Sequence, residues 1–409
     1  MPNLNVETMF IVGAGFSHYA GLPLTSSFTE ALLEAREFGA GPSRVLVEFL
    51  SSFIHHAFGH SKSAKAKYWP DLEDLFTCVD LSANSGHHLG SAFSPAHLRT
   101  VRRALLSRII RMLEQRYRAG RRSKGSEWRK LDELFVRLDP LRVGFISMNW
   151  DNVIERKLAA VSASPSIDYC CDALAAWIPE PPVRDHFSSD KAFIREVYKG
   201  QPIAVAALPV DRKQSEKATP IVKIHGSANW LYCDNCHQLF WLQPDEAARI
   251  ANQLIRDDDL SRMRPFLRSK LRYQVETLDD IALQTKVKCL CSPDVELGTR
   301  IATFSYRKAL DFAMFQKSWF AAEELLRGAD RWVFIGYSLP PADYEFKYLL
   351  KRIQLSRSKP PTFVIVSGGS KNDVRRTYEN YQRFFGKCVS KANFFSTGLS
   401  PDAITAACP

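Results

Sequence analysis

Residues Met9–Pro23 read MFIVGAGFSHYAGLP, and this stretch decides the fold. Four apolar residues, Met9–Val12, predict a short buried strand. Gly13, Ala14 and Gly15 follow at once, and glycine lets the backbone turn where a side chain would clash. Such a turn presents backbone N–H groups to a phosphate. The third glycine of the G-x-G-x-x-G fingerprint is absent, so the stretch alone fits an ordinary β-to-α turn as well as a nucleotide loop.

The composition describes a globular chain. Its 409 residues are enough for two domains, or for one domain with sizeable insertions, and 45% of them are hydrophobic. No run approaches the roughly 20 apolar residues of a membrane span. No charged leader or signal-type apolar segment precedes the first predicted strand. We therefore expect a cytoplasmic protein without a membrane segment.

The net charge of +11 permits contact with nucleic acid or with an acidic partner. Part of the excess lies in residues 102–125, where Arg and Lys recur at helical spacing around apolar residues. One explanation is a helix with one buried stripe and a solvated basic face; the alternative is a surface for nucleic acid or an acidic protein. No base-reading motif accompanies the segment, so sequence-specific recognition of nucleic acid is not supported.

Four more segments predict buried strands, and each passes at its carboxyl end into small or polar residues. They are RVGFISMNW (142–150), PIVKIHGSANW (220–230), DRWVFIGYS (330–338) and TFVIVSGG (362–369). Carboxyl ends of parallel strands meet at one edge of a sheet, where ligand groups gather. The sequence therefore predicts an α/β protein: a Rossmann-like open parallel sheet with helices on both faces.

Helical periodicity fills much of the remaining sequence. Apolar residues recur at three- and four-residue intervals in residues 27–39, 71–83, 95–117 and 126–138. We predict a catalytic core of residues 1–40, 141–230 and 300–409, a helical insertion of residues 41–140, and a small cysteine-containing module of residues 231–299. Residues 162–219 and 242–287 show no pattern that assigns them.

Candidate catalytic residues follow two of the predicted strands. Asn149 and Asp151 alternate through SMNWDN and would emerge on one side of the extended chain. Asn149 can grip a ribose hydroxyl or position a water, whereas Asp151 is equally well explained as the N-cap of the helix that follows. His225 ends the third strand and could act as a general base; the alternative is a structural histidine.

Nine cysteines are an odd number, and four of them form two close pairs, which favours a metal site in a reducing compartment over a disulfide framework. The pairs are Cys233 with Cys236, and Cys289 with Cys291. Four thiolates can complete a closed, structural, tetrahedral zinc site. Four unliganded cysteines are the alternative, and His237 could replace one thiolate.

Taken together, these motifs resemble the sirtuin-like family, most closely its bacterial branch that degrades nicotinamide adenine dinucleotide (NAD⁺) during phage defence. The matches run from Gly13 to about Leu350. In chain order they are Gly13, Ala14, Gly15, Ser17, Gly21 and Pro23 for the family's GAG-x-S loop and later G-I-P, Asn149 and Asp151 for N-x-D, His225 and Gly226 for His-Gly, the cysteine pairs, and Gly336, Tyr337 and Ser338 for G-T-S.

The resemblance implies a role for each matched residue. The first loop, with Gly13, Ala14, Gly15, Ser17 and Pro23, would hold the pyrophosphate, and Gly336 with Ser338 would contact the adenosine side. Asn149 would orient the ribose or a water, and His225 would accept a proton. Asp151 would support them, and Asp343 is a weaker candidate.

Two departures from the family bear on the reaction. Deacylating sirtuins continue the first loop with Phe-Arg, where this chain has Leu24–Ser27. They also present an F-G-E strand edge to an acyl-lysine peptide, and the nearest stretch here is TRIATFSYRK (299–308). The resemblance then favours water as the acceptor and predicts an NAD⁺ hydrolase, an antiphage effector that depletes NAD⁺. The alternatives are a protein deacylase and a non-catalytic sensor of NAD⁺ or ADP-ribose.

The resemblance also implies regulation by assembly. Relatives work as homo-oligomers or with a separate partner, such as a HerA-type ATPase or an Argonaute-like protein. The basic segment or the helical insertion would supply the contact.

Overall fold

In the computed structural model, the described residues are 6–34, 42–59, 69–161, 167–177, 203–204, 206–207, 218–243, 250–251, 253–267, 287–299, 301 and 313–408. No helix among them is long and apolar enough to cross a membrane.

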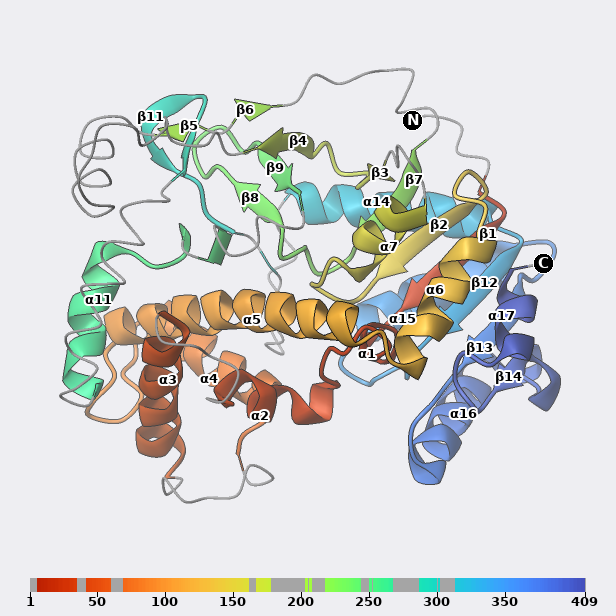
Figure 1. Ribbon diagram of the computed structural model, residues 1–409, viewed down its shortest axis with the longest axis horizontal. Helices are drawn as coiled ribbons and strands as arrows, with labels where there is room; N and C mark the ends of the chain where they lie inside the picture. Colours follow the sequence, from red (N-terminus) through yellow and green to blue (C-terminus); the bar gives the residue numbers. More distant parts are fainter. Residues whose placement is uncertain are drawn as a thin grey trace.

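The centre of the molecule is a seven-stranded parallel sheet with the order β14-β13-β12-β1-β2-β7-β3 (Figure 1). The five long strands are β1 (Thr8–Val12), β2 (Val143–Ser147), β7 (Thr219–Lys223), β12 (Arg331–Ile335) and β13 (Thr362–Val366). This confirms the predicted open parallel sheet. The edge strands β3 (Ile167–Asp168) and β14 (Phe394–Phe395) were not predicted, because two residues carry no periodic pattern.

The strand order reverses beside β1. The chain passes from β1 outward through β2 to β7, and later returns to β12 on the other side of β1. In open parallel sheets, ligands bind outside the carboxyl ends of the strands where the order reverses. The loops that follow β1 and β12 therefore occupy the position at which a ligand is expected.

Both faces of the sheet are covered by helices, as predicted. In β1, Phe10 and Val12 enter one core cluster, and Met9 and Ile11 enter the other. Side chains of a strand alternate between the two faces, so a strand buried on both sides reads as one apolar run. The second face carries α14 (Ala313–Gly328), α15 (Tyr344–Ser356) and α16 (Lys371–Phe385); the first carries α1 (Ala14–His18), α6 (Ser126–Arg137), α7 (Val153–Val161) and α17 (Pro401–Ala407).

A long helix, α5 (Pro95–Ser123), runs across the molecule beside the sheet (Figure 1). Three further helices pack against it: α2 (Phe28–Leu33), α3 (Pro42–Phe58) and α4 (Leu72–Ser85). Sequence patterns indicated α2, α4, α5 and α6 but not α3. The expected end of the first helix, at Gly39, lies outside the described residues.

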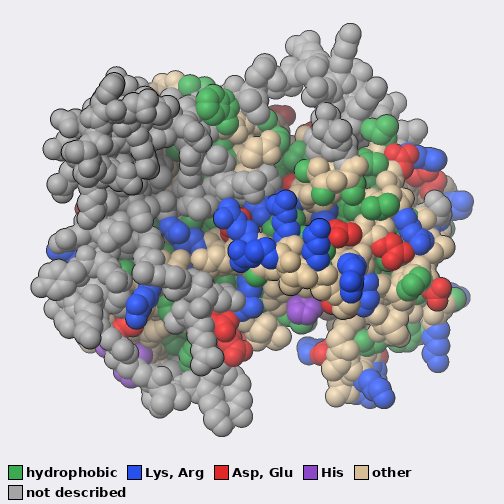
Figure 2. Space-filling view, in the orientation of Figure 1, with side chains coloured by type: hydrophobic (Ala, Val, Ile, Leu, Met, Phe, Trp, Pro, Cys, Tyr) green, Lys and Arg blue, Asp and Glu red, His purple; other side chains and the backbone are tan. Residues whose placement is uncertain are grey.

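The basic face of α5 is partly covered by other parts of the protein. Arg108 is fully buried, Arg103 binds the buried Asp259 of α11 (Asp257–Met263) with Nε–Oδ2 at 2.7 Å, and Arg116 lies 2.7 Å from Glu34. Burial lowers the pKa of Arg111 to about 10. Several arginines of this helix therefore pack against neighbouring elements rather than lying fully in solvent. Exposed cations remain at its carboxyl end, and Figure 2 shows Lys and Arg side chains gathered near the middle of the viewed face.

Two small sheets lie beside the central sheet, above α5 in the view of Figure 1. One has the order β6-β4-β9-β8 and the other β11-β10-β5. Their strands are β4 (Leu174–Trp177), β5 (Ile203–Ala204), β6 (Ala206–Ala207), β8 (Trp230–Tyr232), β9 (Leu239–Leu242), β10 (Val287–Cys289) and β11 (Ser292–Glu296). The cysteine pairs lie in the β8–β9 turn and at the β10–β11 turn.

Candidate functional site

A cavity of about 250 Å³ opens at the carboxyl ends of β1, β2, β7 and β12, where the strand order reverses. Nine of the ten residues predicted from the sequence for catalysis or cofactor binding line it: Gly13, Ala14, Ser17, Pro23, Asn149, Asp151, His225, Gly336 and Ser338. Segments that are more than 200 residues apart in the chain thus meet at one site, as the parallel sheet predicts.

Gly15 lies one step behind the cavity, where the β1 and β12 loops touch. A Cβ added to Gly15 would come within 2.7 Å of the Gly336 Cα atom, and one added to Gly336 would come within 2.2 Å of the Phe16 nitrogen. Gly336 also has φ +60°, a conformation that favours glycine. These two glycines are therefore required for the close approach of the two loops.

The first loop offers a ligand fewer backbone N–H groups than expected. The Gly13 amide donates to the Ile335 carbonyl (3.2 Å), the Gly15 amide to the Gly336 carbonyl (3.0 Å), and the Phe16 amide to the Gly13 carbonyl (2.9 Å). Of these four successive amides, Ala14 alone has no backbone acceptor within the described residues. The prediction of a loop with several bare N–H groups is corrected to one.

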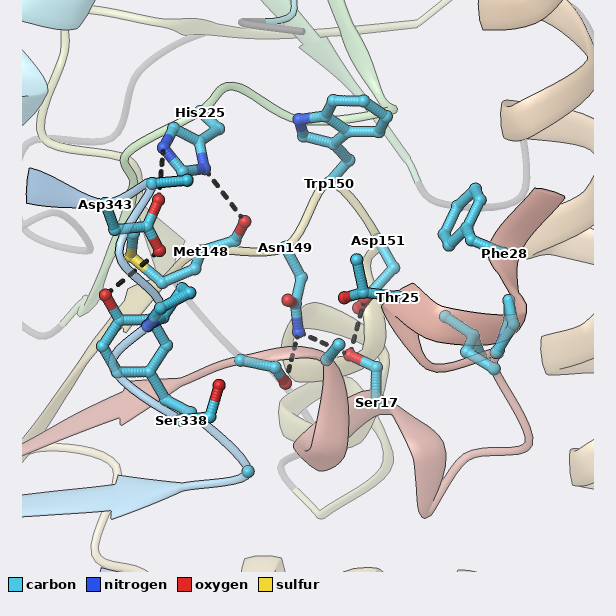
Figure 3. A pocket seen from close by; sticks show the side chains of 18 of the residues that line it. Ser17, Thr25, Phe28, Met148, Asn149, Trp150, Asp151, His225, Ser338 and Asp343 are labelled. Carbon is cyan, nitrogen blue, oxygen red and sulfur yellow. Dashed lines mark hydrogen bonds and ion pairs between the residues drawn. The ribbon is translucent and has the colours of Figure 1, made fainter. Parts of the chain in front are cut away.

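Ser17 connects the two polar motifs of the site (Figure 3). The Asn149 amide donates to the Gly13 carbonyl and to Ser17 Oγ, both at 2.8 Å, and Ser17 Oγ donates to Asp151 Oδ2 at 2.6 Å. Both hydrogens of the Asn149 amide are thus used inside the protein. Its Oδ1 atom is the part that can accept a hydrogen bond from a ligand.

Asp151 bonds to the start of α7 and also lines the cavity. Its Oδ1 accepts the Val153 amide at 3.1 Å, although Asn152, rather than Asp151, is the residue directly before the helix. Burial raises the pKa of Asp151, against the opposing effects of the Lys223 charge and of the hydrogen bond from Ser17. The carboxylate therefore belongs to the fold and to the site at once.

His225 faces an acid across the cavity. Its Nδ1 lies 3.2 Å from the Met148 carbonyl, an acceptor, which assigns the ring proton to Nδ1. Its Nε2 lies 4.0 Å from Asp343 Oδ1, and Asp343 Oδ2 accepts the Tyr337 hydroxyl at 3.1 Å (Figure 3). The ring can thus take a proton on Nε2, beside a carboxylate that would stabilise the resulting positive charge.

Other wall residues were not predicted. Thr25 and Phe28 come from the segment after Pro23, and Glu73 and Leu113 come from α4 and α5. An apolar or acidic residue within a helical pattern gives no signal that it reaches a distant cavity. Beneath the wall lies Lys223, which was also missed, although a lysine inside the apolar run IVKI was a visible irregularity.

The four predicted cysteines form one cluster. The sulfur atoms of Cys233, Cys236, Cys289 and Cys291 all lie within 4.8 Å of one another. Two of these separations, Cys233 to Cys291 and Cys236 to Cys289, are 3.6 Å. Zinc–sulfur bonds of about 2.3 Å in a tetrahedron require sulfurs roughly 3.8 Å apart, so the cluster fits zinc. His237 instead has Nδ1 2.8 Å from the Tyr232 hydroxyl.

No protein-family model matches the chain, and no curated protein matches it. Among solved structures, the chain is similar to one described as "Structural Basis for the Mechanism and Regulation of Sir2 Enzymes", with 13% identity and a TM-score of 0.30 over 99% of this chain and 91% of that one. It is also similar to one described as "Sir2-p53 peptide-NAD+", with 12% identity and a TM-score of 0.32 over 98% of this chain and 90% of that one.

Proposed function

We propose that this protein is an NAD⁺ hydrolase that releases nicotinamide and ADP-ribose. The observation that carries the proposal is the meeting of Asn149 and His225, which follow the neighbouring strands β2 and β7, in one cavity with the β1 and β12 loops. The choice of NAD⁺ as the substrate rests on the resemblance of the sequence motifs to sirtuin-like NAD⁺-degrading proteins.

The reaction requires charge stabilisation and a placed water more than acid help. Nicotinamide is already a cationic leaving group, so the glycosidic bond breaks with its electron pair moving to the ring nitrogen. The ribose then carries oxocarbenium-like charge, and a water oxygen bonds to its C1′ atom. In the proposal, Asn149 Oδ1 accepts from a ribose hydroxyl or from that water, which holds the reactants in place.

His225 takes the proton from the attacking water in this scheme. Its Nδ1 proton is directed to the Met148 carbonyl, which leaves Nε2 as the basic atom. Asp343 lies 4.0 Å from Nε2 and would stabilise the imidazolium that forms. Tyr337, which donates to Asp343, fixes that carboxylate.

The rest of the cavity would hold the remainder of NAD⁺. The Ala14 amide is available to a pyrophosphate oxygen, and Ser338 lies on the β12 loop, where the resemblance places the adenosine side. Zinc held by the four cysteines would be structural, since four thiolates leave no open coordination position. It would take no part in the reaction.

The wider role that we propose is antiphage defence by NAD⁺ depletion in the cytoplasm. Such an enzyme must be restrained until infection, and the resemblance suggests control by homo-oligomers or by a partner such as a HerA-type ATPase or an Argonaute-like protein. Phage plating on cells that express the wild type or Asn149→Ala, with cellular NAD⁺ measured during infection, tests this role. Equal plating and equal NAD⁺ would refute it.

The activity is tested by measuring nicotinamide release from NAD⁺ by purified wild type, Asn149→Ala and His225→Ala, each with and without an acetyl-lysine peptide. We expect release that is independent of peptide and is lost in both variants. Release that requires peptide would instead identify a deacylase. The segment that bears on a peptide site, residues 299–308, lies largely outside the described residues.

A calorimetric titration with ADP-ribose completes the test. Binding without turnover by the wild type, with or without peptide, would favour a sensor of NAD⁺ or ADP-ribose over an enzyme. Asn149→Ala should lose turnover while it keeps ADP-ribose binding, because its proposed contact acts at the reacting ribose.

A further inference from the structure

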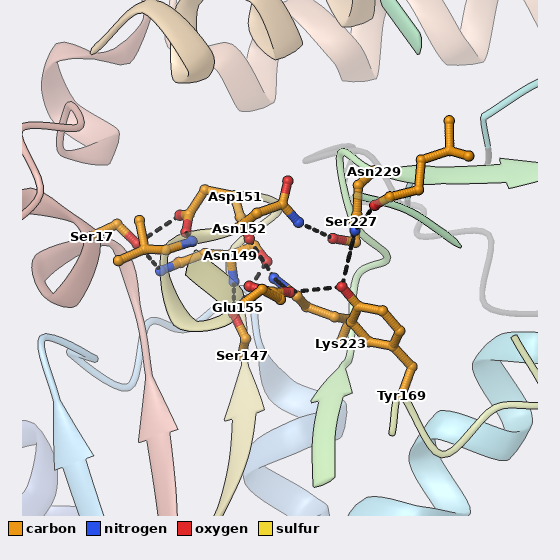
Figure 4. A network of polar contacts seen from close by, with 12 residues as sticks. Ser17, Ser147, Asn149, Asp151, Asn152, Glu155, Tyr169, Lys223, Ser227 and Asn229 are labelled. Carbon is orange, nitrogen blue, oxygen red and sulfur yellow. Dashed lines mark hydrogen bonds and ion pairs between the residues drawn. The ribbon is translucent and has the colours of Figure 1, made fainter. Parts of the chain in front are cut away.

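A fully buried lysine lies directly beneath the turn that carries Asn149 and Asp151 (Figure 4). Lys223 is the last residue of β7, and its Nζ lies 3.0 Å from Glu155 Oε1 of α7. The same Nζ donates to the backbone carbonyl of Asp151. One ammonium group thus connects strand β7, helix α7 and the turn between β2 and α7.

The ion pair belongs to a larger buried network. Tyr169 donates its hydroxyl hydrogen to Glu155 Oε1 at 3.0 Å, and Asn229 donates to the Tyr169 oxygen at 3.1 Å and to the Leu242 carbonyl at 2.8 Å. A second bond links the turn to the segment after β7, because Asn152 donates to Ser227 Oγ at 3.0 Å. The network therefore reaches from the candidate site to strand β9 of the small sheet.

Stability alone does not explain a charged pair at this depth. Removing two charges from water costs several kcal/mol per ion, and apolar side chains of similar volume often give an equally stable or more stable protein. Glu155 Oε2 has no hydrogen-bond partner among the described residues, but the hydrogen bonds that the network does make hold its members in one arrangement. The part of the network nearest the candidate site is the turn of residues 149–152, which carries both Asn149 and Asp151.

We propose that Lys223 is a positioning residue, which holds the 149–152 turn so that Asn149 and Asp151 both meet Ser17. This inference rests on the proposed hydrolase activity, because the turn matters only if Asn149 orients the reacting ribose or water. Lys223 acts through the turn, since it does not line the cavity itself.

Lys223 has two contacts, the Asp151 carbonyl and Glu155, and each would give a different experimental result if it were the important one. If Lys223 serves only to neutralise Glu155, removing both charges together should restore turnover. If it holds the turn, turnover stays low even when the fold recovers. A misplacement of about 1 Å can reduce turnover on the order of 100-fold, so we expect a loss of that order in kcat with a smaller change in KM.

The experiment measures kcat, KM and the melting temperature for wild type, Lys223→Met, Glu155→Gln and the double variant Lys223→Met with Glu155→Gln. Lys157→Met is the matched control: Lys157 is also a buried lysine, 2% exposed, and its partner is Asp132 on α6, away from the turn. We expect the double variant to regain much of the melting temperature lost in Lys223→Met but not its kcat. Lys157→Met should keep the wild-type kcat.

Three results would overturn the inference. Wild-type kcat in the folded double variant would show that Lys223 only neutralises Glu155. Should the double variant not fold, Glu155→Gln decides, because it leaves the bond to the Asp151 carbonyl intact and should keep kcat within a few-fold; a loss as large as that of Lys223→Met would refute the proposal. An active wild type with an equally active Lys223→Met would refute the inference alone. A wild type that shows no turnover when purified and does not deplete NAD⁺ in infected cells would refute the hydrolase itself.

Discussion

Ser17 is the side chain that joins the motif after β1 to the motif after β2. Its hydroxyl donates to Asp151 and accepts from Asn149, and the residue is 2% exposed. The position of the Asn149 amide therefore depends on this hydroxyl together with the Gly13 carbonyl.

We predict that Ser17→Ala reduces turnover at least as strongly as it reduces stability. The substitution leaves one buried donor and one buried acceptor without Ser17, at a cost of about 1–3 kcal/mol. Nicotinamide release and chemical denaturation measure the two effects. Ser123→Ala is the control, because the exposed Ser123 hydroxyl bonds only within its own helix turn. Full activity in Ser17→Ala would show that Asn149 is held by the Gly13 carbonyl alone.

Asp151 should reduce stability at neutral pH. The buried cluster holds two carboxylates, Asp151 and Glu155, and one ammonium, Lys223, and burial raises the pKa of Asp151. An acid whose pKa is higher in the folded than in the unfolded state loses stability as pH rises from the unfolded pKa through the folded pKa. Replacement by a neutral side chain removes that loss.

We therefore predict that Asp151→Asn melts at a higher temperature than wild type at pH 8, and that the difference shrinks as the pH falls through the raised pKa of Asp151 toward its unfolded value. Turnover should fall, since the variant would offer Ser17 an amide in place of a carboxylate. Melting curves at pH 5 and pH 8 measure the effect. A variant less stable than wild type at pH 8 would mean that the lost hydrogen bond from Ser17 and the lost attraction to Lys223 outweigh the cost of burying the charge.

Among the residues, motifs located nine that line the cavity, but they located neither the wall residues of the helices, such as Glu73 and Leu113, nor the supporting Lys223. Asn149 and His225 stand in short polar motifs at strand ends, and strand ends of a parallel sheet are where ligand-binding residues are expected. Lys223 meets Asp151 and Glu155, which lie far from it in the chain, and a single sequence does not show which distant side chain a residue meets.

Among the elements, the two hairpins that carry the cysteines are short and have little core of their own. Strands β8 and β9 form one hairpin and β10 and β11 the other, and the backbones of Tyr232 and Gly298 exchange hydrogen bonds at 2.6 and 3.0 Å between them. The cysteine cluster joins the two hairpins. A structural metal is a common means of stabilising so small a unit.

We predict that the purified protein contains one zinc ion per chain and that Cys236→Ser loses it. The variant should melt several degrees lower, because the free energy of metal binding contributes to folding. Elemental analysis and melting curves before and after a strong chelator measure both quantities. Cys78→Ser is the control, since Cys78 lies on α4 outside the cluster. A metal-free wild type with an unchanged melting temperature would refute the prediction.

Elements were predictable where a long periodic pattern coincided with burial on one or two faces. The five long strands satisfied this condition, as did α4, α5 and α6. The environment of α5 was not predictable, because its arginines are paired by partners such as Asp259 and Glu34, which lie far from it in sequence. The short strands of the small sheets are set by their neighbours and leave no local pattern.

For the whole molecule, the important feature is a core shared between the sheet and the helices that lie between β1 and β2 in sequence. One cluster of buried side chains includes Phe10 and Phe145 of the sheet, Phe135 of α6, residues of α3, α4 and α5, and Trp230 of the small sheet. The Phe135 ring stacks on Phe145 at 6.0 Å, and Phe145 stacks on Phe10 at 5.3 Å. The helices of residues 42–137 thus contribute to the same core as strands β1 and β2.

We accordingly predict that the described parts of the chain unfold in one cooperative step. Phe135→Ala should lower the free energy of unfolding by about 3–5 kcal/mol, the usual cost of removing a buried phenylalanine, and should lower the whole transition rather than split it. Val136→Ala, whose side chain is 72% exposed on the same helix, should change little. Differential scanning calorimetry distinguishes the outcomes, because a second, unshifted transition in Phe135→Ala would mean that the helices fold apart from the sheet. A single shifted transition would show that helices and sheet form one cooperative unit. A ligand bound in the cavity, which is lined by both Glu73 of α4 and Ser338 of the β12 loop, would then stabilise that whole unit.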